Sequence, residues 1–427
     1  MAPGAGLPDD PALVALQATA ARARGVWVCR RGEVEPAVPL RRHPVDSAAL
    51  GAHDAGHADT VWPLYHDLGP GRYDPAWRLA FRSVNTAFAE AAAAEAAPGA
   101  TVWVHGHTLQ LVPAILRRHR PDLRIGFTLP THFPAGDTLP VHREVVRGLL
   151  GADLVGFASA AAAENFLRRS QDMTDRPPCV GVFPTSAQTP AIAALVANPA
   201  VSAAVAQLRA RLGDPETVIL CVNPPEQSQG VEERLVALGT AFGDGRLDPQ
   251  RCAVVQIVLG RPTDLAVGDG IARAAAHVNG LHAAVGRPVV HYVVDTPNLA
   301  ERVAYYRAAD VLVATPLREG TTVAALEFAA AARDGGAVVL SEFSGTATVL
   351  RDAYRVNPHD PDSVLAGITA ALTDPQREQR MARMRGYVGG YHTFTWAEAF
   401  LRTLRATPRF ESTPVAVRYA TGATVGR

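Results

Sequence analysis

The stretch YYRAADVLVATPLREGTTVAALEFAAA, residues 305–331, contains a complete strand–turn–helix unit. The run Val311–Thr315 is short and apolar, which is typical of a parallel strand covered by helices on both faces. The turn passes through Gly320, and we expect a helix to begin near Thr322. Unpaired N–H groups at such a helix start face the crevice at the strand ends, where they can bind an anionic group.

Short apolar runs alternate with longer Ala-, Leu- and Arg-rich stretches along the whole chain, which predicts an α/β fold with parallel sheets. The expected strands are Gly25–Cys29, Thr101–Val104, Arg124–Leu129, Leu154–Phe157, Thr217–Val222, Ala253–Leu259, Val289–Val294, Val311–Thr315 and Ala337–Leu340. The expected helices are Pro75–Ala96, Leu109–Arg118, Val141–Gly151, Ala160–Arg169, Ser202–Leu212, Val231–Ala241, Leu299–Ala308, Thr322–Arg333 and Pro361–Thr373.

The length of 427 residues exceeds the roughly 250–300 at which one hydrophobic core stops growing, so we expect two domains. The Pro-, Thr- and Ala-rich segment Pro184–Pro199 is the expected connection between them. The expected divisions are a tail over 1–24, a first domain over 25–185, a second domain over 186–385, a segment 386–405 that packs back on the first domain, and a tail over 406–427.

The composition excludes several classes of function. Lys and Arg number 41 and Asp and Glu number 41, so no overall field recruits nucleic acid or an anionic membrane surface. No run reaches the ~18 apolar residues of a membrane helix, and no leader pattern opens the sequence, so the expected location is the cytoplasm. The four cysteines lie far apart, which argues against a zinc site and a disulfide framework.

Four stretches resemble the trehalose-6-phosphate synthase family, in the family's order. They are TVWPLYHDL with YDPAWRLAFRSVN (60–68 and 73–85), VWVHGHTLQLVPAILRRHRPDLRIGF (102–127), the opening stretch, and GGAVVLSEFSGTATVLRDAYRVNPHD (335–360). The resemblance implies a GT-B fold, in which two Rossmann-like domains with parallel sheets face each other. It also implies retaining transfer of a glucosyl unit from a nucleoside-diphosphate glucose to glucose 6-phosphate, with no metal or other cofactor.

The resemblance places a nucleotide-sugar site at the start of the helix in the opening stretch. Glu327 stands where the family's glutamate holds the ribose hydroxyls, although without the resemblance it would be interpreted as a carboxylate on a helix face. The other residues implied for this site are Glu319, where the family usually has aspartate, and Gly320, Thr321, Thr322 and Val323.

The family grips the diphosphate with a motif of the form VDRLDYTKG, and this chain reads VNPPEQSQG at residues 222–230. Pro224 stands at the arginine position and Gln229 at the lysine position. Loss of one preorganised donor commonly costs ~3–4 kcal/mol of transition-state stabilisation. Both substitutions together therefore predict very slow glucosyl transfer.

The first domain departs from the family in the same way. The family sequence GFFLHIPFP is GFTLPTHFP here, so that Pro130 replaces a histidine that contacts the donor sugar. His132 lies two residues further on and is a weak candidate for replacing that histidine, because neighbouring side chains at a strand end point in different directions.

The acceptor side also shows substitutions. Gly106 replaces the family's acceptor-binding aspartate. The candidates that remain for an acceptor pocket are His107, Trp62 and Arg261. Arg261 lies one residue before the position of the family's phosphate-binding arginine, so it is a candidate if the alignment shifts by one residue there. Trp62 is equally well explained by packing. His105 and His107 are spaced like metal ligands, but no third ligand is evident, and we expect no metal site.

The family's opening strand, with its Gly-Gly loop, has no counterpart before Gly25, where the sequence is Ala-rich. We therefore expect an exposed sheet edge, or cover from a partner subunit or a second copy of the chain.

Three hypotheses follow. The first is a trehalose-6-phosphate synthase-like glycosyltransferase with weak, altered or absent catalysis, whose partners are a nucleotide-sugar and a sugar phosphate. The second is a non-catalytic paralogue that acts as a binding or regulatory subunit. The third is a pseudo-glycosyltransferase that couples cyclitol-type substrates.

Overall fold

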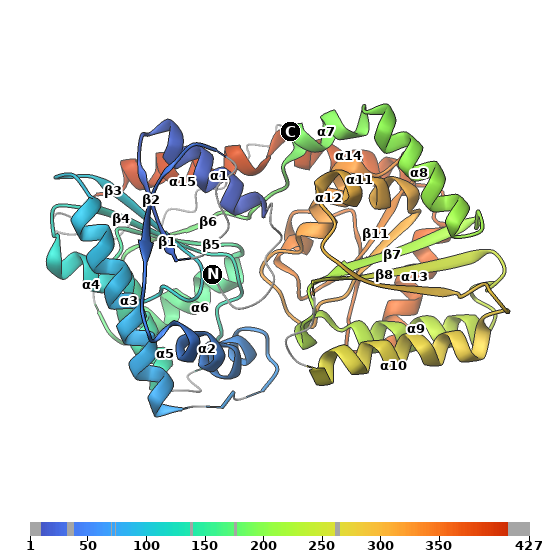
Figure 1. The fold of residues 1–427 in the computed structure, drawn as a ribbon, viewed down its shortest axis with the longest axis horizontal. Coiled ribbons are helices and arrows are strands. Elements are labelled where there is room, and N and C mark those ends of the chain that lie inside the picture. The colour runs from blue at the N-terminus through green and yellow to red at the C-terminus, as the bar shows by residue number, and fades with distance from the viewer. Residues whose placement is uncertain are drawn as a thin grey trace. The chain divides into compact units, whose positions relative to one another are not determined.

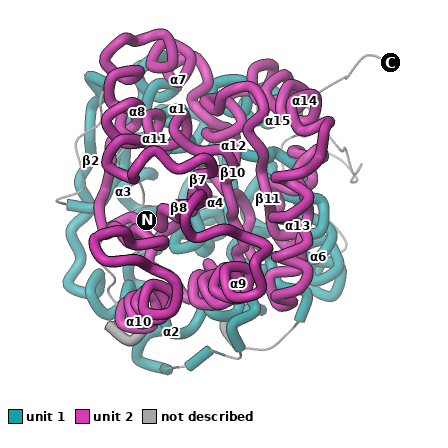
Figure 2. The backbone as a smooth tube through the Cα atoms, turned by 90° about the vertical axis from the view of Figure 1, so that its right-hand side faces the viewer, with its two compact units in different colours: residues 1–3, 10–185, 393–427 teal, residues 4–9, 186–392 magenta. Residues whose placement is uncertain are grey.

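The computed structural model describes residues 10–31, 38–69, 71–72, 74–136, 140–174, 177–260 and 265–408. The chain divides into two compact units (Figures 1 and 2). Unit 1 holds residues 10–185 and the C-terminal residues from Thr393, and unit 2 holds residues 186–392. Every strand pair within the sheets is parallel, which confirms the predicted α/β class. In the described part of the chain, no single helix is long and apolar enough to span a membrane. The helices 189–196 and 199–211 meet the length and composition criteria only when taken together, and they are bent by 75° relative to each other.

Unit 1 contains two parallel sheets. The strands of the larger one, in the order β3-β4-β5-β6, are Thr101–His105, Arg124–Leu129, Leu154–Phe157 and Cys179–Val182. The smaller one pairs β1, Val26–Arg30, with β2, Arg41–Val45. The helices of the unit are α1 (Pro11–Arg22), α2 (Leu50–Tyr65), α3 (Pro75–Glu95), α4 (Val112–His119), α5 (Pro140–Leu149), α6 (Ala160–Gln171) and α15 (Thr393–Ala406).

The expectation of a tail over residues 1–24 is wrong for its described part. Helix α1 forms there because the Asp10 carboxylate accepts hydrogen bonds from the N–H groups of Ala12 and Leu13, and Pro11 fits the first helical position. The Ala-rich composition that argues against a strand favours this helix. Residues 1–9 lie outside the described part.

The return to unit 1 begins at Thr393, so residues 386–392 belong to unit 2, contrary to the expected start at 386. In α15, Trp396 donates through its indole N–H to the carbonyl of Phe183 at 3.0 Å, and Phe400 stacks on Trp103 at 4.3 Å. A Cβ at Gly126 of β4 would lie 2.7 Å from Leu404. Glycine at that position therefore lets α15 lie against the sheet.

Unit 2 is built on one six-stranded sheet. In the order β12-β11-β10-β7-β8-β9, its strands are Tyr354–Val356, Ala337–Ser341, Val311–Ala314, Thr217–Asn223, Cys252–Leu259 and Val290–Asp295. The helices are α7 (Thr189–Val196), α8 (Pro199–Arg211), α9 (Val231–Gly243), α10 (Leu265–His282), α11 (Leu299–Ala308), α12 (Val323–Ala331), α13 (Pro361–Thr373) and α14 (Arg377–Gly390). Helix α7 lies inside the segment expected to be the connection, so that segment is partly helical.

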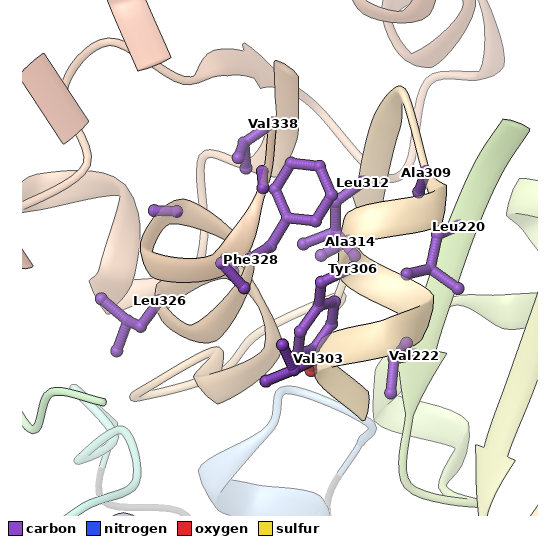
Figure 3. Packing of buried hydrophobic residues seen from close by; sticks show 14 of the residues in the cluster. Leu220, Val222, Val303, Tyr306, Ala309, Leu312, Ala314, Leu326, Phe328 and Val338 are labelled. Carbon is purple, nitrogen blue, oxygen red and sulfur yellow. The ribbon is translucent and has the colours of Figure 1, made fainter. Parts of the chain in front are cut away.

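Alternate side chains of β7 enter two separate cores, as a strand covered on both faces requires. Leu220 and Val222 pack with α11 and α12, where Tyr306 and Phe328 meet at 6.1 Å (Figure 3). Ile219 and Cys221, on the opposite face of β7, pack in a second core with residues of α9, α10 and α13. The sheet of unit 2 is thereby fixed as a rigid base for the loops at its strand ends.

Candidate functional site

The loop after β7 is held in one conformation by backbone contacts. Gly230 has φ 57°, and a Cβ there would lie 2.5 Å from the carbonyl oxygen of Thr315, so only glycine fits. The N–H of Leu317 donates to the carbonyl of Ser228 at 2.7 Å, which joins this loop to the loop after β10. Gln229 is consequently placed beside the residues that lead into α12.

The start of α12 is a closed hydrogen-bonded network. Glu319 accepts from the Gln229 amide at 3.2 Å and from the hydroxyl of Thr322. That hydroxyl lies 2.8 Å from the hydroxyl of Ser344, and the N–H of Thr322 donates to Thr346 at 2.8 Å. The structure thus brings Gln229, Glu319 and Thr322 together, and the network satisfies one of the N–H groups at the helix start.

Two buried acidic side chains, Glu226 and Glu319, lie near the start of α12. Burial raises the pKa of Glu319 to about 7. Burial and the neighbouring charge of Glu319 raise the pKa of Glu226 to about 8, because each carboxylate opposes ionisation of the other. An anionic diphosphate at this position would meet two acidic side chains. Glu226 was not singled out from the sequence, although it lies inside the quoted motif VNPPEQSQG.

A buried cation lies beneath the same loop. Arg234 of α9 is 2% exposed and donates to Thr315 at 2.8 Å, to Asn223 at 2.9 Å and to Gln256 at 3.0 Å. These are neutral oxygens at the ends of β10, β7 and in β8, and its Nε has no hydrogen-bond partner in the structure. Arg234 therefore ties three strands together. In the sequence, the feature that could have pointed to Arg234 is its position four residues after Gly230.

Glu327 lies in a buried ion pair. Its carboxylate accepts two hydrogen bonds from Arg302, both at 2.9 Å, and one from the Tyr306 hydroxyl at 2.9 Å. Arg302 is 1% exposed and Glu327 0% exposed, and burial together with the charge of Glu327 raises the pKa of Tyr306 well above its usual value. Both oxygens already accept hydrogen bonds, so the role of Glu327 toward ribose hydroxyls stays a prediction.

In unit 1, aromatic and histidine rings gather around the predicted acceptor residues. Trp62 stacks on His66 at 3.8 Å and lies 5.2 Å from the ring of His107. His107 in turn lies 4.7 Å from His57, which is 5.9 Å from His53. Trp62 and His107 are thus brought together, and the two α2 histidines join them.

Four buried ring nitrogens of this cluster lack hydrogen-bond partners in the structure. Neither ring nitrogen of His57 has a hydrogen-bond partner, and the same holds for Nε2 of His53 and of His107. Burial, and then the neighbouring histidines, hold the pKa of His57 well below 6.5, and burial does the same for His107. The rings of His57 and His107 are therefore neutral at pH 7. His53 and His57 were missed in the sequence, where their i, i+4 spacing was the available signal.

The remaining predicted positions are more scattered. Gly106 has φ 98° with open space at its Cβ, so the backbone itself adopts a conformation that favours glycine. Pro130 directly follows β4, and both it and His132 are half-buried. Arg261 lies outside the described residues. No group of three or more His, Cys, Asp or Glu suited to a metal ion occurs in the described ranges.

Comparison with known proteins gives consistent matches. The profile of Glycosyltransferase family 20 matches residues 45–406. A trehalose-6-phosphate synthase of Mycolicibacterium smegmatis is 36% identical, over 92% of this chain and 87% of the relative. One from Mycobacterium sp. (strain JLS) is 37% identical, over 92% and 90%.

Solved structures agree with this result. The α,α-trehalose 6-phosphate synthase of Burkholderia multivorans is 25% identical with a TM-score of 0.84, covering 92% of this chain and 93% of that one. The Burkholderia xenovorans enzyme in complex with glucose-6-phosphate has a TM-score of 0.85 at 24% identity, covering 94% and 97%, and supports the fold.

Proposed function

The chain belongs to glycosyltransferase family 20 as a trehalose-6-phosphate synthase-like glycosyltransferase, and we propose that its altered site makes the family reaction weak, changed or absent. The proposal rests above all on the hydrogen bond from Gln229 to Glu319, at the place where a cation would neutralise the departing diphosphate. A neutral amide and an acidic group cannot stabilise the charge that develops there.

The size of the deficit follows from the two missing donors. Each is worth ~3–4 kcal/mol of transition-state stabilisation, so losing both lowers the rate by roughly four to six orders of magnitude. Arg234 does not compensate, because its described hydrogen bonds all go to protein oxygens. We therefore expect no robust synthesis of trehalose 6-phosphate.

The direct test is an assay of glucose 6-phosphate with UDP-, GDP- or ADP-glucose, which should give no turnover near the median enzyme rate of roughly 10 per second. The variant Gln229→Lys should strengthen UDP binding in calorimetry, because a cation then faces the diphosphate and pairs with Glu319. Gln227→Lys is the matched control, since Gln227 is an exposed residue in the same turn. Turnover of several per second by the unaltered protein would contradict the proposal.

A non-catalytic binding subunit is the second candidate. The observation in its favour is that Glu327 is fully buried and already hydrogen-bonded to Arg302 and Tyr306. Under this function, calorimetry with UDP or GDP gives weak or undetectable heat in the unaltered protein. Micromolar affinity would instead favour an enzyme that has replaced the lost cations with other residues.

A further inference from the structure

The two edge strands of the sheet in unit 2 differ in how they are protected. At one edge, β12 has three residues, and its middle residue Arg355 is exposed. A short strand and a charged side chain are the usual protection of a sheet edge against pairing with another chain. At the other edge, β9 has six residues, reads VHYVVD and contains no Gly, Pro or Lys. Its Val294 is 43% exposed. The edge formed by β9 therefore lacks the usual protection.

Alternate residues of β9 direct their backbone groups away from the sheet. The carbonyls of Val289 and Asp295 accept hydrogen bonds from the N–H groups of Val254 and Gly260, at 2.8 and 2.9 Å. In a parallel ladder, every second residue bonds to the same neighbouring strand. The residues between those that bond to β8 therefore face the open edge. These outward residues are Val290, Tyr292 and Val294.

The open stretch of this edge is bounded at both ends. Asn279 of α10 closes the beginning, because its side-chain amide donates to the carbonyl of Val290 and its Oδ1 accepts from the N–H of Val290, both at 2.9 Å. Pro297, which has no N–H, follows the strand. Within the described ranges, no residue hydrogen-bonds to the outward groups of Tyr292 or Val294. Two N–H and two C=O groups are thus left for another strand.

A second copy of β9 matches this stretch in one register. Two identical edges that are related by a two-fold axis pair antiparallel. In an antiparallel pair, opposite residues that face each other exchange both N–H···O bonds. If Tyr292 lies opposite Val294 of the second copy, the two-fold axis also places Val294 opposite Tyr292, and all outward groups are used. Pairing Tyr292 with itself would instead place Val294 opposite Val290, whose groups are already bonded to Asn279.

The side chains agree with the same register. His291 lies opposite Asp295 of the second copy, and an imidazole N–H can donate to a carboxylate. On the other face, Tyr292 lies opposite Val294, which is a stabilising pair of an aromatic and a β-branched residue. Val293 lies on the two-fold axis, opposite its own counterpart. Val294 and Asp295 are exposed in the structure, so both are available for these contacts.

Helix α10 leaves room for the second copy. A two-fold axis perpendicular to the sheet places α10 of both copies on the same side of the joined sheet. Asn279 reaches the edge of β9 from this helix, and Ala276 and Ala272 share its face by their i−3 and i−7 spacing. Both side chains are small, and Ala276 is exposed. The two helices can therefore approach each other without a long side chain on that face.

We propose that β9 pairs antiparallel with β9 of a second copy of this chain, with Tyr292 opposite Val294, and joins the two six-stranded sheets into one. Two short strands bury less area than the standard interface of about 1,600 Å², so the expected dissociation constant is micromolar. The contact concerns unit 2 alone and does not depend on the family reaction.

Sedimentation velocity of the full-length protein tests the proposal. Over roughly 1–100 µM, the unaltered chain should show a monomer–dimer equilibrium. Val294→Pro removes an outward N–H from each copy and leaves the ladder between β8 and β9 intact, so the dissociation constant should rise at least roughly tenfold. Arg355→Pro is the matched control at the opposite edge. Arg355 faces outward there, because the carbonyl of its neighbour Val356 accepts from the N–H of Glu342 at 2.9 Å.

A cross-linking arm tests the register and does not depend on the folding of the proline variant. Opposite residues without mutual hydrogen bonds have Cα atoms about 4.5 Å apart, which lies within the range that a disulfide spans. Val293→Cys should therefore form a disulfide-linked dimer under mild oxidation, identified by mass spectrometry of the linked peptide. Val294→Cys is the control, because this more exposed residue is displaced from its own counterpart by two residues.

Three results would overturn the proposal. The first is an unaltered chain that stays monomeric at about 100 µM. The second is a dimer that Val294→Pro does not weaken, or that Arg355→Pro weakens equally. The third is a Val294→Cys variant that cross-links as readily as Val293→Cys, because the strands would then not be in the proposed register.

Discussion

The buried polar groups around Glu319 in unit 2 are hydrogen-bonded to one another, whereas several of those around His57 in unit 1 have no hydrogen-bond partner. In unit 2, Glu319 is hydrogen-bonded to Gln229 and Thr322, and its neighbour Glu226 has a raised pKa. In unit 1, His57 lies among aromatic and imidazole rings with neither nitrogen partnered. In both places burial favours the neutral form, because it raises the pKa of Glu226 and Glu319 and lowers the pKa of His57.

This contrast teaches that Gln229, Glu319 and Thr322 form an organised hydrogen-bonded group at the start of α12. Gln229 is 4% exposed and donates to Glu319, so these two side chains are joined by a hydrogen bond without an ion pair between them. The cluster of unit 1 is less complete, because buried nitrogens without partners are costly. Three predictions test the contrast, in order of expected effect.

The largest effect is expected from breaking the buried ion pair of unit 2. Arg302→Met leaves Glu327 buried with one hydroxyl partner, and the free energy of unfolding should fall by about 3–5 kcal/mol. Urea denaturation measures the change. The double variant Arg302→Met with Glu327→Leu should recover most of the loss, because it removes the unpaired charge as well. If Arg302→Met is as stable as the unaltered chain, the ion pair with Glu327 does not stabilise unit 2.

The two units should respond to pH in opposite directions. His57 and His107 have folded pKa values well below 6.5, so unit 1 keeps its stability above that pH. As the pH falls below 6.5 the unfolded form binds protons first, and unit 1 loses up to about 1.4 kcal/mol per pH unit per histidine. All five tryptophans lie in unit 1, so their fluorescence reports its unfolding.

Unit 2 has raised carboxyl pKa values, about 8 for Glu226 and about 7 for Glu319, against 4.5 for an ordinary glutamate. Their contribution is fully present below pH 4.5 and is lost as the pH rises toward 8. Glu226→Gln should therefore stabilise unit 2 more at pH 8 than at pH 5, by hydrogen exchange of β7 and β8. Glu233→Gln, at an exposed position of α9, is the control. Equal effects at both pH values would contradict the assignment.

The smallest effect is expected from relieving the unpartnered nitrogens of unit 1. His57→Phe removes two buried nitrogens and keeps a ring of similar size, so the stability of unit 1 should rise by about 1–2 kcal/mol. Its loss of stability between pH 6.5 and 5 should also become shallower. Tryptophan fluorescence measures both, and His119→Phe, at an exposed position, is the control. A steeper acid loss in His57→Phe would refute the role of His57.

Regular elements with strong local patterns were predictable from the sequence. The run Val311–Thr315 was expected as a strand, and β10 covers Val311–Ala314. By contrast β2 reads RRHPV, which lacks an apolar pattern, and its pairing with β1 decides its conformation. Helix α1 was missed because a cap at Asp10 has a weak signal in an Ala-rich segment. Local propensity thus predicted most of the strands and helices, but not how the strands divide into sheets.

The candidate site was predictable only in part. The substitutions Pro224 and Gln229 were visible in the motif, whereas Glu226, Arg234 and His57 became informative only through their neighbours. The pKa of Glu226 depends on Glu319, and the state of Glu327 depends on Arg302. These partners are far apart in the sequence, so no local sequence pattern predicts that they are in contact.

The sequence by itself determined the fold class and the family, and it led to the prediction that Pro224 and Gln229 replace the family's two diphosphate cations. Short apolar runs and motif residues carry that information locally. Tertiary structure alone decided that Gln229 binds Glu319, that Glu327 is buried against Arg302, and that β1 and β3 belong to separate sheets. The physical reason is that burial, pairing and charge are properties of contacts between distant segments, and these exist only once the chain has folded.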